Sequence, residues 1–183
     1  MIIKKFFIIF FIIFLTIANA ENKENILNNL KKTNNLSFKF EQYINDNIEI
    51  GSCVIKYPKK IFCAYDGSND KILVSNGKSL VIKTITSYYR YPLNRTPLDI
   101  ILDKNLIINK IYNLKEEISS GPYIHFKLEE NNNEIEIFFD KLSFHLVGWQ
   151  TKDVYQNLSS TYLNNININQ VIDEDLFKLP LQN

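Results

Sequence analysis

The stretch Ile50 to Leu80, IGSCVIKYPKKIFCAYDGSNDKILVSNGKSL, decides the fold of this chain. Short runs that alternate apolar and polar residues are separated there by three turn sequences, Pro58-Lys59-Lys60, Asp66-Gly67-Ser68-Asn69 and Asn76-Gly77. This pattern is typical of consecutive antiparallel strands, a meander, joined by tight turns. Because side chains alternate between the faces of a strand, Cys53, Ile55 and Tyr57 share one face and give the meander an apolar side.

The segments on both sides of this meander predict more strands. Leu36, Phe38 and Phe40 alternate with polar residues and share one face of a strand that precedes the meander. The same reasoning predicts later strands over the ranges 87–91, 123–129, 133–140, 142–149, 154–162 and 166–168. In the range 142–149, strict alternation places Leu146 and Trp149 on opposite faces of the strand.

Two segments have the spacing of short helices instead. Ile26 and Leu30 share one face of a helix within residues 25–32. A second helix begins at Thr96-Pro97-Leu98, where threonine is a favourable cap and proline fits the first helical position. A polar stretch, residues 103–105, follows it.

These elements predict a mainly β (α+β) protein with a single curved antiparallel sheet. A sheet of so many strands must curl, split or close. The predicted helices are few and short, so they are able to cover the mouth of the apolar face but hardly able to fill a closed barrel. An apolar sheet face usually forms a core, and the shortage of helices favours a cavity as the alternative.

The first 20 residues have the features of a secretory signal peptide. Lys4 and Lys5 precede an apolar run over residues 6–17, and Ala18-Asn19-Ala20 forms a typical cleavage site. The apolar run is shorter than the about 20 residues of a membrane-spanning helix. The cleavage point lacks the cysteine of a lipid-anchored protein. We therefore expect an exported, soluble product formed by the single domain 21–183.

The charge of the chain argues against some classes of partner. The whole sequence has a net charge of +1. Removing Lys4 and Lys5 leaves 19 basic residues against 20 acidic ones and makes the charge −1. A nearly neutral chain without a cluster of lysine and arginine is unlike proteins that bind nucleic acid or anionic membranes. We expect a monomer that binds no nucleic acid.

Two cysteines, Cys53 and Cys63, flank the turn at Pro58. In a hairpin centred on that turn they lie nearly opposite each other, on the same face. Disulfides persist in exported proteins, so a Cys53–Cys63 disulfide is one reading. The other is two free thiols that pack as small apolar residues.

Catalytic signals are weak. The sequence contains no nucleophile-elbow, P-loop or dinucleotide-binding motif. His125 and His145 are isolated among polar-face residues, and the acidic run 173–175 lacks the spacing of a calcium loop. We expect no catalytic residue, no metal site and no cofactor.

Several motifs, in order and in spacing, resemble those of the LolA family, the periplasmic carriers of outer-membrane lipoproteins in Gram-negative bacteria. Phe40-Glu41-Gln42 resembles the family's F-x-Q, and Thr96-Pro97-Leu98 its T-P-L helix start. Residues 51–65 and 72–78 resemble its turn and I-V-S-D-G-K segments. The closing segments, 148–153 and 164–180, resemble the alphaproteobacterial branch.

This resemblance implies an unclosed β-barrel with a lid of short helices. The domain 21–183 would carry acylated lipoproteins through the periplasm from an inner-membrane ABC transporter of the LolCDE type to the outer membrane, with or without a LolB-type acceptor there. It would use no ATP and catalyse no reaction. The resemblance assigns to the lipid-binding cavity Leu36, Phe38, Phe40, Cys53, Ile55, Ile61 and Cys63. It assigns to the lid Ile26, Leu30, Leu98, Ile101 and Leu102.

One position departs from the family pattern. The arginine that holds the family's lid shut is replaced here by Tyr57. Either the tyrosine hydroxyl bonds a lid carbonyl as a neutral donor, or Arg90 or Arg95 takes over. Two other functions stay open beside the lipoprotein carrier. One is a carrier of another lipid or glycolipid, and the other is a non-enzymatic interaction or sensor domain.

Overall fold

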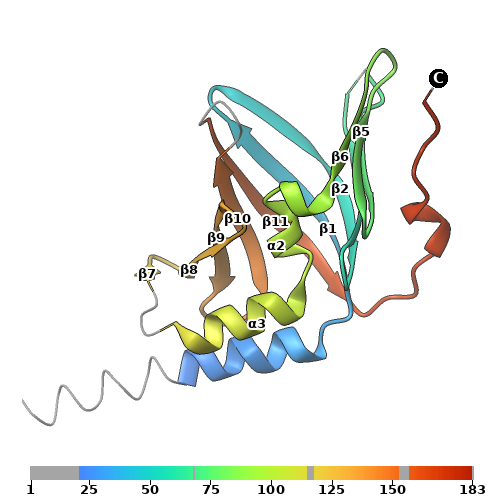
Figure 1. Ribbon diagram of the computed structural model, residues 1–183. Coiled ribbons are helices and arrows are strands. Elements are labelled where there is room, and N and C mark those ends of the chain that lie inside the picture. The colour runs from blue at the N-terminus through green and yellow to red at the C-terminus, as the bar shows by residue number, and fades with distance from the viewer. Residues whose placement is uncertain (1–20, 68, 115–117, 153–156, 183) are drawn as a thin grey trace, which may run out of the picture.

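The computed structural model describes residues 21–67, 69–114, 118–152 and 157–182 (Figure 1). The signal peptide expected over residues 1–20 lies outside these described residues. Within the described part of the chain, no helix has the length and apolar character needed to cross a bilayer.

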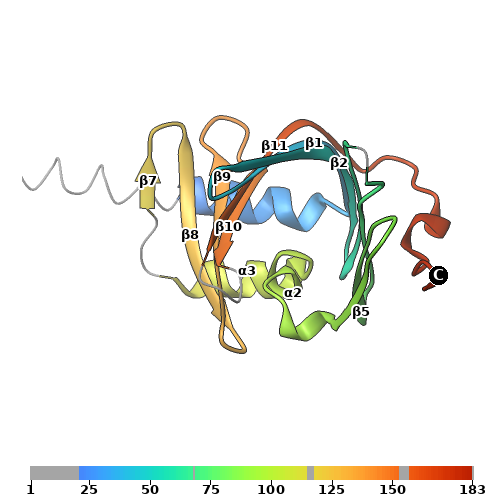
Figure 2. The same cartoon turned by 90° about the horizontal axis from the view of Figure 1, so that it is seen from above.

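One antiparallel sheet dominates the structure. Its eleven described strands run in the order β6-β5-β4-β3-β2-β1-β11-β10-β9-β8-β7. The strands are β1 (Asn35–Ile44), β2 (Asn47–Lys56), β3 (Lys60–Tyr65), β4 (Ile72–Asn76), β5 (Ser79–Lys83), β6 (Tyr88–Pro92), β7 (Ile118–Ser120), β8 (Tyr123–Glu130), β9 (Asn133–Asp140), β10 (Leu146–Lys152) and β11 (Leu158–Ile168). Figure 2 shows the sheet curving around its concave face. Since β6 and β7 are not paired with each other, the curved sheet stays unclosed, which confirms the predicted fold class.

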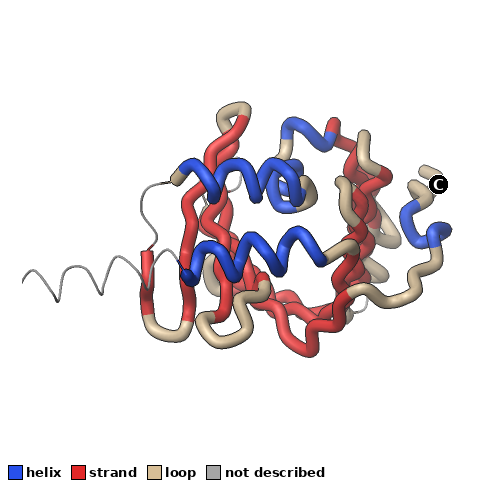
Figure 3. Tube along the Cα trace, turned by 90° about the horizontal axis from the view of Figure 1, so that it is seen from below, coloured by secondary structure: helices blue, strands red, loops and turns tan. Residues whose placement is uncertain are grey.

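All the described helices except the C-terminal one lie on the concave side of the sheet (Figures 2 and 3). Residues 21–32 form the first helix. The chain that leaves β6 then crosses the concavity as η1 (Leu93–Arg95), α2 (Leu98–Ile101) and α3 (Lys104–Asn113) before it reaches β7. We call α2 and its flanking residues 96–103 the lid segment.

The first helix and α3 lie side by side (Figures 1 and 3), and two lysines join them. The ammonium of Lys23 donates hydrogen bonds to the carbonyls of Tyr112, at 2.9 Å, and Leu114, at 2.7 Å. At the other end, the ammonium of Lys104 donates to the carbonyl of Thr33 at 2.6 Å. Each lysine satisfies carbonyls at the C-terminal end of the opposite helix, where a positive charge also favours the helix dipole.

The main core fills the space between these helices and the part of the concave face that they cover. Side chains of the first helix, the lid segment and α3 meet the apolar face of the sheet there. Its fully buried members include Ile26, Ile55, Ile61, Ile101, Leu102, Ile107, Ile111, Phe126 and Phe139.

A smaller buried cluster lies on the outer face, under the C-terminal segment. The helix η2 (Glu174–Phe177) contacts β3 and β4 from outside, as Figure 2 shows. Its Phe177 is buried, and the ammonium of Lys60 lies 5.7 Å from the centre of the ring. Glu174 forms ion pairs with Lys56 and Lys60. The acidic run 173–175 is therefore the exposed start of η2, and it fixes this segment to the sheet.

The strand expected at 142–149 is shorter than predicted. Leu142 lies in a turn and is 90% exposed. The carboxylate of Asp140 organises this turn by accepting the backbone N–H groups of Leu142, at 3.1 Å, and Ser143, at 2.7 Å. These bonds, together with one from the hydroxyl of Ser143, lower the pKa of Asp140, chiefly through the N–H of Ser143. The strand β10 begins only at Leu146.

Three other features also differ from the sequence expectation. The hydroxyl of Thr96 donates back to the carbonyl of Leu93 at 2.8 Å and does not cap α2. The polar stretch 103–105 opens a separate helix, because the carboxylate of Asp103 accepts the N–H of Leu106 at 3.1 Å as an N-cap. The two last expected strands are one, β11; the start of the first, at Val154, lies outside the described residues.

Candidate functional site

A cavity of about 170 Å³ lies between the lid segment and the concave face of the sheet. Pro97 and Leu98 of the lid segment cover it. Its remaining lining residues come from six strands: Phe40 and Gln42, Cys53, Ile61 with Cys63 and Tyr65, Leu73, Trp149 with Thr151, and Thr161. The lining is apolar over most of its area and polar at one end, and none of its residues is charged.

The residues expected in the cavity divide into two groups. Phe40, Cys53, Ile61 and Cys63 line it. Leu36, Phe38 and Ile55 are buried in the adjoining core and do not line it. Register does not separate the two groups, because Phe38 pairs with Cys53 and Ile55 pairs with Ile61. Leu36, Phe38 and Ile55 pack instead among the side chains of the first helix and α3 in the main core.

The residues expected in the lid divide in the same way. Leu98 is half-buried and reaches the cavity. Ile26, Leu30, Ile101 and Leu102 are buried in the main core, where they hold the helices against the sheet. Only the first part of the lid segment therefore faces the cavity.

Trp149 is the cavity residue that strict alternation misplaces. The pairing of β10 with β9 shifts between Leu146 and Gly148. This bulge adds one residue, so that Leu146 and Trp149 both belong to the main core. The ring of Trp149 meets that of Phe38 edge to face, with centroids 6.3 Å apart.

Other cavity residues were detectable from alternation but were not predicted. Gln42 continues the face of Phe38 and Phe40, and Tyr65 continues the face of Ile61 and Cys63. Leu73, Pro97, Thr151 and Thr161 also line the cavity, and alternation did not single them out. The polar residues and the proline among these do not belong to an apolar pattern, so the sequence did not mark them as cavity residues.

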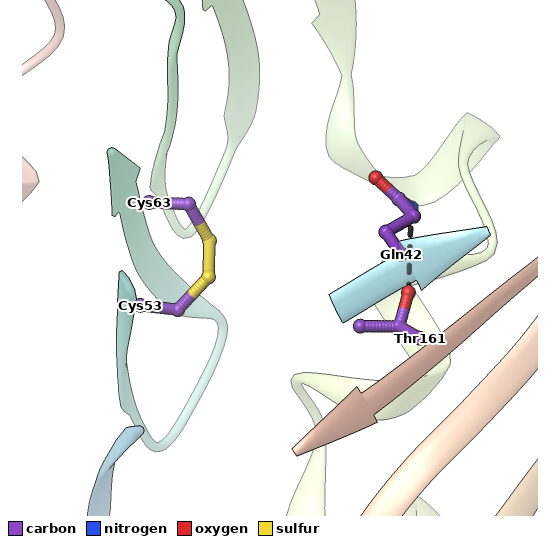
Figure 4. Close-up of a disulfide and its surroundings, with 4 residues drawn as sticks. All are labelled: Gln42, Cys53, Cys63 and Thr161. Atoms are coloured by element: carbon purple, nitrogen blue, oxygen red, sulfur yellow. Dashed lines mark hydrogen bonds between the residues drawn. A yellow bond between two sulfur atoms is a disulfide. The ribbon is translucent and has the colours of Figure 1, made fainter. Parts of the chain in front are cut away.

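Cys53 and Cys63 form a disulfide, with the sulfur atoms 2.00 Å apart. The two residues are directly opposite each other in the pairing of β2 with β3, and Figure 4 shows the bond joining these neighbouring strands. Both residues line the cavity. The disulfide therefore closes one hairpin and forms part of the cavity wall.

The polar end of the cavity is built on β1, β10 and β11. Gln42 and Trp149 both pair with Thr161, and Ser159 pairs with Thr151 on the next rung. The amide nitrogen of Gln42 donates to the hydroxyl of Ser159 at 3.0 Å. It also donates to the hydroxyl of Thr161 at 3.3 Å, as Figure 4 shows. We call Gln42, Thr151, Ser159 and Thr161 the polar cluster.

A pair of opposite charges lies beside this end, where Glu49 pairs with Gln42 in the sheet. The ammonium of Lys71 binds both carboxylate oxygens of Glu49, at 2.6 and 2.7 Å. It also lies 4.1 Å from the centre of the Tyr65 ring. Burial, with a smaller contribution from Glu49, raises the pKa of the Tyr65 phenol, so this cavity residue is neutral at pH 7.

Lys59 attaches the lid segment to the sheet. Its backbone N–H donates to the carbonyl of Leu102 at 2.7 Å. Its ammonium lies 2.8 Å from Asp99 and 3.5 Å from Asp103, both in the lid segment. The hydrogen bond to Asp99 raises the pKa of Lys59. The hydroxyl of Ser75, on β4, donates to the carbonyl of Lys59 at 2.9 Å and fixes the turn from below.

Tyr57, the expected lid-gating residue, makes a different contact. Its hydroxyl is buried and has no hydrogen-bond partner among the described residues, and burial raises its pKa. Arg90 donates to the hydroxyl of Ser79, across β5 and β6, at 3.1 and 3.2 Å. Arg95 is exposed at the end of η1. Lys59 makes the contacts with the lid segment that the resemblance assigns to the family's arginine.

The two histidines were expected to be isolated, and for His125 this is wrong. Its Nδ1 atom lies 2.9 Å from a carboxylate oxygen of Glu136. Its ring centre lies 4.7 Å from that of Phe138, with which it pairs on the outer face. His145 is half-buried. In the described ranges, no group of three histidine, cysteine or acidic side chains is placed to hold a metal ion.

Several solved structures are similar to this one at low sequence identity. A LolA superfamily protein from Nitrosomonas europaea is 7% identical, with a TM-score of 0.44 over 79% of this chain and 89% of the other. A conserved protein from Thermus thermophilus is 8% identical, with a TM-score of 0.49 over 88% and 94%.

The MucA/MucB complex of Pseudomonas aeruginosa is 11% identical, with a TM-score of 0.38. That alignment covers 88% of this chain and 61% of the other. A search among curated protein sequences gave no significant match.

The sequence match is more decisive than these distant structural likenesses. The family model described as "Outer membrane lipoprotein carrier protein LolA" matches residues 31–180, which include every residue that lines the cavity. The chain belongs to the LolA family.

Proposed function

We propose that residues 21–183 form a periplasmic carrier that binds the acyl chains of lipoproteins in the cavity under the lid segment. The observation that carries this proposal is the cavity itself. Its walls are the apolar face of the curved sheet, and its cover is a short helical segment held by a few polar contacts at Lys59. Such a site shelters hydrocarbon from water and has a part that is able to move.

The size of the cavity implies that this part does move. Pockets for ligands of ordinary size have volumes of about 300–1,000 Å³. The cavity measures about 170 Å³, so it accommodates only part of an acyl chain while Pro97 and Leu98 stay in place. Loading therefore requires the lid segment to lift away from the sheet.

The energies also favour a loosely filled site. Burying a chain of about a dozen methylenes gains roughly 10 kcal/mol. Two or three chains, each completely buried, would exceed the limit of about 18–21 kcal/mol for non-covalent binding, and the cargo would not leave. Breaking the contacts of Lys59 on loading offsets part of the gain. The carrier then releases its cargo without a chemical step.

The partners follow from this role. The donor is an inner-membrane ABC transporter of the LolCDE type, and the recipient is the outer membrane, with or without a LolB-type acceptor. Residues 1–20 direct export and are removed. The carrier acts as a monomer, uses no cofactor and catalyses no reaction.

The decisive test is a release assay. Purified protein 21–183 is added to spheroplasts that synthesise a radiolabelled lipoprotein, and soluble complexes are isolated. We expect a stoichiometric complex with the acylated lipoprotein that depends on the membrane ATPase. Failure of folded protein to release any lipoprotein would overturn the proposal.

A second readout reports the cavity directly. Trp149 is the only tryptophan in the sequence and lines the cavity. Acyl chains that carry bromine atoms should quench its fluorescence on binding. If they quench while no lipoprotein is released, the cargo is another lipid.

One observation favours an interaction domain as the second candidate. Tyr43, Ile48 and Ile50 lie together on the outer face of β1 and β2, where Tyr43 pairs with Ile48. Ile48 is 62% and Ile50 47% exposed. Exposed apolar patches often mark contacts with other proteins. This reading predicts neither lipoprotein release nor quenching of Trp149.

A further inference from the structure

We propose that the polar cluster recognises the neutral ester or amide carbonyl through which an acyl chain is joined to its head group. The inference rests on the proposed function, because it requires a lipid in the cavity. It adds the direction in which the lipid lies and the chemical class that is preferred.

The direction follows from the position of the polar cluster in the sheet. On the concave face of β1, the buried residues Phe38 and Phe40 are followed by the half-buried Gln42 and Ile44. Residues 45–47, in the turn to β2, are exposed. The polar cluster therefore lies between the apolar lining and the open end of the concavity. A bound chain has its hydrocarbon against Ile61 and Leu73 and its head group toward that end.

The hydrogen bonds leave the cluster ready to bind a carbonyl. The amide nitrogen of Gln42 uses the oxygen atoms of Ser159 and Thr161 as acceptors. The hydrogens of these two hydroxyls remain available as donors, since neither donates to another described residue. The side-chain oxygen of Gln42 likewise remains available as an acceptor. Because Thr151 and Thr161 line the cavity and Ser159 does not, the cluster offers the hydroxyls of these two threonines beside the side-chain oxygen of Gln42, at the boundary between hydrocarbon and water.

The charges select a neutral group. No residue that lines the cavity is charged. The nearby ammonium of Lys71 is already bound to Glu49 by two short contacts. A carboxylate or phosphate would lose water at this site without gaining a free cation, which is unfavourable. An ester or amide carbonyl needs only the neutral hydroxyl donors.

The test compares two lipids that differ only in the carbonyl. Palmitoylglycerol has an ester, and hexadecylglycerol has the corresponding ether with a chain of the same length. Each is titrated against mature protein 21–183, with the fluorescence of Trp149 as the readout. We expect the ester to bind roughly three- to tenfold more tightly than the ether, which is the effect of one net hydrogen bond. Palmitate, which has a carboxylate, should bind less tightly than the ester.

Two variants each remove one polar side chain of the cluster. A third variant removes a similar side chain outside the cavity and serves as the control. Gln42→Leu and, separately, Thr161→Val should abolish the preference for the ester over the ether, measured as the ratio of the two affinities. Gln150→Leu is the control. Gln150 makes a similar bond to Ser160, at 2.6 Å, but on the outer face of the same strands. It should keep the preference. Thr161→Val alone decides the question if Gln42→Leu does not fold.

The outcomes separate the two proposals. If the wild-type protein binds neither lipid, the proposed function fails. If it binds both lipids equally, if both folded cluster variants retain the preference for the ester, or if palmitate binds most tightly, the inference about the polar cluster is wrong and the carrier function stands.

Discussion

The ammonium of Lys59 lies 2.8 Å from a carboxylate oxygen of Asp99, and this ion pair joins the turn between β2 and β3 to the lid segment. Asp99 is only 6% exposed, so the pair and the backbone N–H of Lys59 are the polar attachments of a largely buried surface. Removing the cation from such a pair lowers the free energy of unfolding by more than the intact pair contributes to it, because a buried carboxylate is left unpaired.

Replacing Lys59 by methionine should loosen the lid segment. The change leaves the carboxylate of Asp99 buried and unpaired, which lowers the free energy of unfolding by about 1–3 kcal/mol. The amide hydrogens of Ile100 and Leu102, which are bonded within the lid segment, should exchange faster with solvent. Hydrogen-exchange mass spectrometry of this peptide measures the effect.

Two further variants interpret that result. Lys59→Arg keeps the charge and should exchange nearly as the wild type does. The double variant Lys59→Met/Asp99→Leu should recover stability, because no unpaired carboxylate remains. Equal exchange in the wild type and Lys59→Met would show that Lys59 does not hold the lid segment.

The same attachment should weaken at high pH. Since Asp99 raises the pKa of Lys59 above its ordinary value of 10.5, the pair stabilises the folded state below that value. The contribution is lost as the pH rises through the higher pKa of the folded state. Urea unfolding at several pH values above 9 measures it as the difference between wild type and Lys59→Met, which should shrink at the alkaline end. A constant difference would contradict the prediction.

The disulfide should contribute to stability. Cys53 and Cys63 are 10 residues apart in the sequence. Closing a loop of this size in the unfolded chain stabilises a protein by roughly 2–3 kcal/mol. Cys53→Ala/Cys63→Ala should lower the urea midpoint accordingly, and a reducing agent should destabilise the wild type but not this variant. An unchanged midpoint in both comparisons would rule out the bond in solution.

A charge on the lid segment should impair acyl binding without unfolding the protein. Leu98 is half-buried and faces the cavity, so Leu98→Asp places a carboxylate beside the bound hydrocarbon. We expect the affinity for a brominated acyl chain to fall about tenfold or more. Leu142→Asp introduces the same charge at a residue that is 90% exposed and should have no effect. Equal binding by both folded variants would exclude this cavity as the acyl site.

Much of the sheet and part of the site could be predicted from alternation alone. Phe40, Cys53 and Ile61 lie on the predicted face because β1, β2 and β3 are regular strands without a bulge between them. The bulge between Leu146 and Gly148 interrupts the alternation, so alternation placed Trp149 on the wrong face. A bulge leaves no reliable trace in the apolar pattern of a single sequence.

The lid attachment was out of reach for a different reason. Lys59 and Asp99 are 40 residues apart, and neither has a local feature that predicts the pairing. From the sequence, Lys59 is identified only as a turn residue. Asp99 is identified only as a favourable charge near the start of a helix. Their contact arises when the sheet curves and brings the turn against the helical segment.

The path of η1, α2 and α3 across the concavity has a consequence for unloading. This stretch is continuous with β6 at one end and leads to β7 at the other. The strands β6 and β7 are the two edge strands of the sheet. A cover tethered at both ends has far fewer arrangements when open than a free flap would have. The conformational entropy lost on closing is correspondingly small, because the cost of closing a chain depends on how widely its ends wander. In the proposed carrier, the lid segment would therefore return to its closed position after the cargo leaves without an external supply of energy.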